Sequence, residues 1–173
     1  MALRRRFLCA ALFAFGGAAG CLTARCCSEA VCLLAWQRAA GFALDAPVLA
    51  ALVWNLLFPV CVVFFAGSVA GFLLAPLADL MFGVCYGFVA LVCLRHAGTA
   101  AAFTLLLLAG LGCVPCLLLS ARAVRVSRGL CAAFQSGGKR TFDCAGDAAA
   151  MAAALAAVAA LSVLEGLLLA RWL

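Results

Sequence analysis

From Val48 to Leu94 the chain runs for 47 residues with a single charged side chain, Asp79. A transmembrane helix needs about 20 apolar residues, so this run is too long for one span and suits two. The segment 75–79 offers a reversal between them, with Asp79 capping the start of the second span. Backbone in lipid must satisfy its own hydrogen bonds, and helices do this. The run predicts an all-α, polytopic membrane bundle.

The composition agrees with a membrane protein. Hydrophobic residues make up 70% of the 173 residues and charged residues 10%, against about 45–50% and about 25% in soluble domains. Such a chain leaves no room for a large soluble domain. The net charge of +6 does not indicate nucleic-acid binding, because the basic residues lie mostly at the ends of apolar runs, where membrane topology and anionic lipids account for them.

We expect a single membrane domain over residues 1–173, with about five spans joined by short loops. The first run follows three arginines and could instead be a signal segment. Residues 18–21 resemble a lipoprotein cleavage box, but Ala18 stands where a large aliphatic residue is usual, so we interpret the run as a span. The expected spans are approximately 7–23, 48–74, 77–94, 99–120 and 148–170, with an outer loop at 26–47 and a cytoplasmic loop at 121–147.

The distribution of basic residues predicts the orientation. Five spans place the amino terminus and the loop after span four on one side, and that side carries eight of the twelve Lys and Arg residues. The positive-inside rule then predicts a cytoplasmic amino terminus and an outward carboxyl terminus in the plasma membrane. We expect Arg122, Arg125 and Arg128 to form a lipid-facing basic cluster at the inner surface.

Two G-x-x-x-G patterns indicate close helix packing. They are Gly67 to Gly71 at the end of span two, and Gly83 to Gly87 in span three. Small residues four apart allow helix backbones to approach closely. Because both pairs lie near the cytoplasmic ends of neighbouring antiparallel spans, we expect them to pack against each other within the chain; a contact between two chains is the alternative.

Polar residues inside the spans are few. Asn55 lies about two turns into span two, and Pro59 follows at i+4, where it removes the backbone donor for the Asn55 carbonyl. Glu165 lies in span five, some five residues from its outer end. These three residues form a candidate intramembrane polar site: either an interhelical hydrogen bond beside a tolerated kink, or a crevice for a substrate or ion.

Cys113 and Cys116 have the C-x-x-C spacing of dithiol redox sites. Redox chemistry needs an accessible thiolate of low pKa, whereas this pair lies several residues inside the bilayer. Thiols within apolar runs behave as small hydrophobes. Apart from this pair the sequence indicates no catalytic residues, and it indicates no metal site and no cofactor.

The central stretch resembles the integral membrane family of stage II sporulation protein M. The resemblance covers roughly residues 1–130 and rests on Asn55-Leu56, Gly67 and Gly71, Pro76-Leu77, Gly83 to Gly87, Gly98, Pro115, and the Ala/Arg/Ser-rich segment 121–128. It implies a non-enzymatic scaffold of endospore engulfment that holds peptidoglycan-degrading partners, stage II sporulation proteins D and P. The alternative hypothesis is a small-molecule permease or the membrane component of a transporter. The third hypothesis is a membrane thiol/disulfide oxidoreductase.

Overall fold

The computed structural model describes residues 2–34, 46–96, 99–137 and 144–172. Its long helices are α1 (Ala2–Cys26), α3 (Pro47–Ala66), α4 (Gly71–His96), α5 (Thr99–Gln135) and α6 (Ala145–Trp172). A short helical segment, 29–34, follows Ser28, whose carbonyl accepts the Val31 and Cys32 N–H groups. All regular structure in the described ranges is helical, which confirms the predicted all-α class.

All five long helices are long and apolar enough to cross a membrane. Large apolar side chains cover the outside of the bundle: Phe64 is 79% exposed, Phe15 70% and Leu73 64%. Soluble monomers rarely expose apolar patches of more than a few hundred Å². The outer surface of the bundle is therefore suited to lipid.

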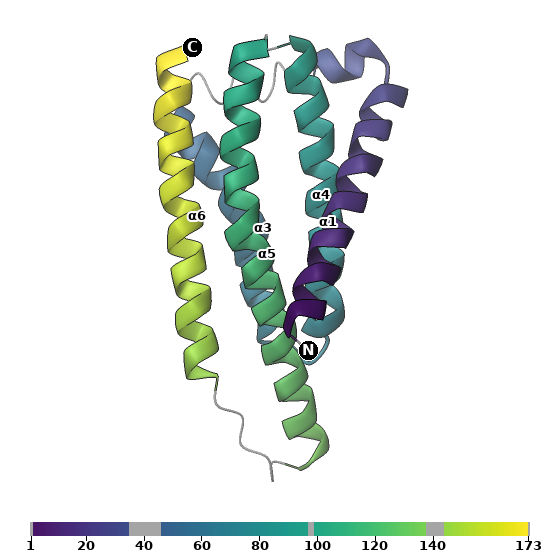
Figure 1. Ribbon diagram of the computed structural model, residues 1–173, viewed down its shortest axis with the longest axis vertical. Helices are drawn as coiled ribbons and strands as arrows, with labels where there is room; N and C mark the ends of the chain where they lie inside the picture. The colour runs from purple at the N-terminus through teal and green to yellow at the C-terminus, as the bar shows by residue number, and fades with distance from the viewer. Residues whose placement is uncertain (1, 35–45, 97–98, 138–143, 173) are drawn as a thin grey trace.

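The helices run alternately up and down through the bundle (Figure 1). Helices α1, α4 and α6 run in one direction and α3 and α5 in the other. One end therefore collects the start of α1, the α3–α4 turn, the end of α5 and the start of α6; we call it the N-terminal end. The start of α1 and the end of α6 therefore lie at opposite ends of the bundle.

The turn between the second and third spans lies earlier than expected. The prediction placed the reversal at 75–79, but α3 ends at Ala66, α4 begins at Gly71, and Pro76 lies inside α4. A tertiary contact stabilises this turn. The Oγ of Ser127 in α5 accepts the N–H of Phe72 at 2.8 Å and donates to the carbonyl of Ser68 at 2.7 Å. The backbone groups freed at the turn thus find a partner from another helix.

Helix α5 is longer than the predicted fourth span. The sequence suggested a span over 99–120 and a loop over 121–147, yet α5 continues to Gln135. Its 37 residues correspond to about 55 Å, well beyond the roughly 30 Å of a hydrocarbon core. The helix extends past its neighbours at the N-terminal end (Figure 1). The basic segment that suggested a loop is helical.

The glycines of α4 pack against α1, not against the end of α3. A Cβ at Gly83 would meet the carbonyl of Phe13, and one at Gly87 would meet the carbonyl of Gly17. On the α1 side, Gly16 and Gly20 are equally close to the α4 backbone. The predicted contact of Gly83 and Gly87 with Gly67 and Gly71 is therefore wrong.

Gly67 and Gly71 lie at the α3–α4 turn and not in the helix-packing contact that the sequence predicted. Gly67 is the C-cap of α3, and a Cβ there would have ordinary space. Gly71 starts α4, and a Cβ on it would meet the carbonyl of Phe65. Both glycines belong to the turn. The glycines of α1 form the other side of this crossing: Gly16 and Gly17 lie against Gly83 and Gly87, and Gly20 lies against Val84 and Phe88.

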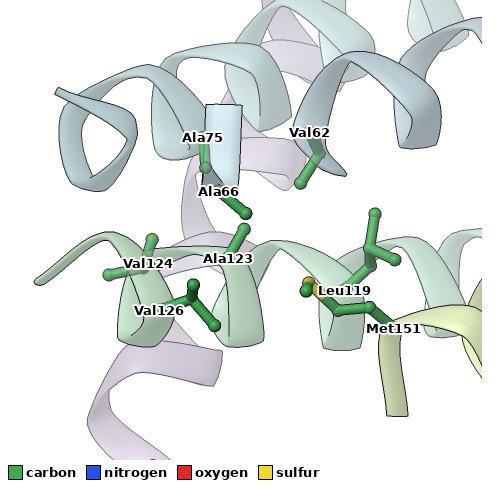
Figure 2. Close-up of a cluster of buried hydrophobic side chains, with 8 residues drawn as sticks. All are labelled: Val62, Ala66, Ala75, Leu119, Ala123, Val124, Val126 and Met151. Carbon is green, nitrogen blue, oxygen red and sulfur yellow. The ribbon is translucent and has the colours of Figure 1, made fainter. Parts of the chain in front are cut away.

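A cluster of buried hydrophobic side chains lies in the half of the bundle nearer the N-terminal end. Figure 2 shows Ala66 of α3 and Ala123 of α5 pointing toward one another, with Ala75 of α4 beside Ala66. Alanines at this crossing let the helices approach closely. The remaining members are Val62, Leu119, Val124, Val126 and Met151. The cluster joins α3, α4, α5 and α6 around the central helix α5.

Candidate functional site

The structure brings Asn55 and Glu165 together. The Nδ2 of Asn55 in α3 donates to Oε2 of Glu165 in α6 at 2.6 Å, across 110 positions of sequence. Pro59, the third member of the predicted site, is buried within α3, where it removes the donor for the Asn55 carbonyl. Both polar side chains are partly buried. Glu165, which lies near the expected outer end of its span, thus bonds to another span.

A second intramembrane polar site centres on Asp79, for which the sequence predicted a helix-capping role. That assignment is wrong, because α4 begins eight residues earlier. Asp79 is fully buried, and its Oδ1 accepts a hydrogen bond from the Oγ of Ser120 in α5 at 2.6 Å. At 1.5 Å per residue it lies about 12 Å along α4 from the start of the helix. Asp79 is thus an acid within a span.

The sequence contains a signal for this burial. The buried positions of α4 include Gly71, Ala75, Asp79, Gly83 and Gly87, which recur every four residues. A stripe of small residues at this spacing marks the face that packs against other helices. Asp79 stands in the middle of that stripe and must therefore face the bundle.

Two thiols border the Asp79 carboxyl. Cys9 of α1 is 1% exposed and interacts with the carboxyl, and Cys116 of α5, 3% exposed, lies within its electrostatic reach. The site therefore joins α1, α4 and α5. Cys116 belongs to the C-x-x-C pair. Both Cys113 and Cys116 are free and buried, so neither thiol is open to a soluble redox partner.

The basic cluster at the N-terminal end has protein partners. Arg122 pairs with Asp147 at 2.7 Å, and Arg125 pairs with the other oxygen of the same carboxylate at 3.3 Å. The guanidinium of Arg128 lies 5.8 Å from the centre of the Phe72 ring. The Arg122 and Arg125 side chains remain partly exposed, whereas the Asp147 side chain is buried. The sequence predicted a lipid-facing cluster without these protein partners, because Asp147 lies on the next helix along the chain.

No protein-family model, curated protein or solved structure matches the chain. The class of protein therefore rests on the fold. Five apolar helices of spanning length, packed as a bundle with apolar side chains outward, define an integral membrane protein of the multi-pass kind.

Proposed function

We propose that the chain is a non-enzymatic scaffold of the plasma membrane. The observation that carries this proposal is that polar side chains of the bundle bind one another across helices. The Asn55–Glu165 bond joins α3 to α6, and the Asp79–Ser120 bond joins α4 to α5. Interhelical hydrogen bonds of this kind hold spans in register. A scaffold needs such a fixed bundle.

Helix α5 provides the frame of the proposed scaffold. It contacts α1, α3, α4 and α6, and it continues beyond them at the N-terminal end. At that end Arg122 of α5 forms an ion pair with Asp147 of α6, and Ser127 of α5 bonds to the α3–α4 turn. A partner bound to the projecting end of α5 would thus be held on a helix that the whole bundle supports.

The resemblance to stage II sporulation protein M suggests a process for this scaffold. We propose that it acts in endospore engulfment and holds peptidoglycan-degrading partners. The positive-inside rule places its N-terminal end, with the projecting part of α5, in the cytoplasm. Partners that degrade the cell wall would then meet the opposite end of the bundle or engage through their own membrane anchors.

The test is affinity purification of the tagged protein in mild detergent from membranes of its sporulating host, with mass spectrometry of the associated proteins. The expected result is enrichment of cell-wall hydrolases or their anchors over a control purification with an unrelated tagged multi-pass protein. Recovery of an ATPase subunit, or of a bound small molecule without any protein, would overturn the scaffold.

A transporter is the second candidate, and the intramembrane acids favour it. Ionisable residues inside spans commonly mark substrate or ion pathways, and the bundle places Glu165 and Asp79 in different helices. The variant Glu165→Gln separates the two proposals. A scaffold keeps its co-purifying partners in this variant, whereas a transporter that uses the carboxylate loses uptake in vesicles.

A further inference from the structure

The Asp79 carboxyl has one satisfied oxygen and one that lacks a partner. Oδ1 accepts the hydroxyl of Ser120, while Oδ2 is buried without a hydrogen-bond partner. The residue is 0% exposed. An ionised carboxylate accepts hydrogen bonds on both oxygens, and leaving one of them bare in an apolar interior is costly. The site therefore lacks the second hydrogen-bond partner that an ionised carboxylate would require.

Among the side chains that the structure describes, none forms an ion pair with Asp79. In the described part of the chain the ion pairs are Arg122–Asp147 and Arg125–Asp147. The groups that interact with the Asp79 carboxyl are the Ser120 hydroxyl from α5 and the thiols of Cys9 and Cys116, from α1 and α5. None of these groups is cationic. An isolated charge in such a place is strongly disfavoured, and a neutral acid is the form that burial allows.

A metal ion does not fit this site. Among the described residues no three His, Cys, Asp or Glu side chains are placed to hold one. Hard cations such as Mg²⁺ and Ca²⁺ need about six oxygen ligands, whereas Asp79 and Ser120 offer two side chains and the neighbouring thiols are soft. A proton needs no coordination shell and no cavity. It is the cation that this arrangement can accept.

We propose that Asp79 is a proton-binding site at the junction of α1, α4 and α5, and that the folded bundle holds its carboxyl as the neutral acid. In this form Oδ1 remains the acceptor for Ser120 and Oδ2 carries the proton. The oxygen that lacks a partner as an acceptor then becomes a donor. The proposal goes beyond the scaffold, because it gives the bundle a ligand, a proton, at the junction of three helices.

Infrared difference spectroscopy of the purified protein in lipid vesicles at neutral pH tests the proposal, since a protonated carboxyl has a C=O stretch that a carboxylate lacks. We expect this band in the wild-type protein and its loss in Asp79→Asn, which keeps the shape of the neutral acid. Glu165→Gln is the matched control, because it removes the other span acid and should leave the Asp79 band in place.

A second variant keeps the test decisive if Asp79→Asn does not fold. Ser120→Ala removes the hydrogen bond to Oδ1, so we expect it to shift the C=O band to higher frequency without abolishing it. A protonated-carboxyl band that is absent from the wild-type protein, or that is the same in wild-type protein, Asp79→Asn and Ser120→Ala, would overturn the proposal.

Discussion

Replacing Gly20 by alanine should force α1 and α4 apart, whereas the same change at Gly17 should not. A Cβ at Gly20 would meet the carbonyl of Val84, whose carbon lies 2.8 Å away, and the nitrogen of Phe88 at 2.9 Å. A Cβ at Gly17 would meet the carbonyl of Gly83 at 3.8 Å, which is ordinary contact. The two glycines lie on the same helix, three residues apart.

The size of the difference follows from what the added methyl group meets. At Gly20 it meets backbone atoms, which no change of rotamer can move. Overpacking of this kind costs about 1–3 kcal/mol. Alanine is also the better helix former by about 1 kcal/mol, but both variants share that gain. We therefore expect Gly20→Ala to be less stable than Gly17→Ala by about 2 kcal/mol, which is roughly 30-fold in the unfolding equilibrium.

The cysteines of the bundle provide the assay. Cys9, Cys93, Cys113 and Cys116 are buried, so a thiol-reactive fluorophore reports unfolding in detergent as these thiols become exposed. Titration with a denaturing detergent under the same conditions gives the free-energy difference. Equal transitions for Gly17→Ala and Gly20→Ala would refute the glycine-mediated crossing of α1 and α4.

The other contacts give three further predictions. Asn55→Leu should destabilise the bundle by about 1 kcal/mol and leave partner co-purification intact; complete loss of an uptake activity would favour a transporter. Ser127→Ala should cost about 1–3 kcal/mol in unfolding titrations, because it removes the acceptor of the Phe72 N–H at the α3–α4 turn. Ser162→Ala, at a buried serine bonded within its own helix, should cost less, and equal losses would contradict the capping role of Ser127. Asp147→Asn should lower stability by more than the roughly 1 kcal/mol of an exposed ion pair, because the Asp147 side chain is buried and pairs with both Arg122 and Arg125; an unchanged unfolding titration would exclude a stabilising role for these ion pairs.

The candidate site was only partly readable from the sequence. Asn55 and Glu165 are recognisable in the sequence as polar residues within apolar runs. Their bond is not, because 110 positions separate them and they meet only when α3 packs on α6. The prediction for Asp79 is wrong because an acid three residues after Pro76 resembles the start of a helix. Asp79 also belongs to the stripe of small residues that recurs every four positions along α4, and this pattern predicts that it faces the bundle. The sequence is therefore compatible with both a cap and a buried acid at this position.

The amino-acid sequence by itself determined the class of this protein. Long apolar runs must form helices in a bilayer, because backbone polar groups have no other partners there, and five apolar runs predict five such helices. Which helices meet was decided by tertiary structure. Lipid is as apolar as the inside of the bundle, so hydrophobicity does not mark the buried face of a span. The pairing of α1 with α4, the bond of Asp79 to Ser120 and the turn held by Ser127 depend on close backbone approach and matched polar groups, and these exist only once the helices have packed.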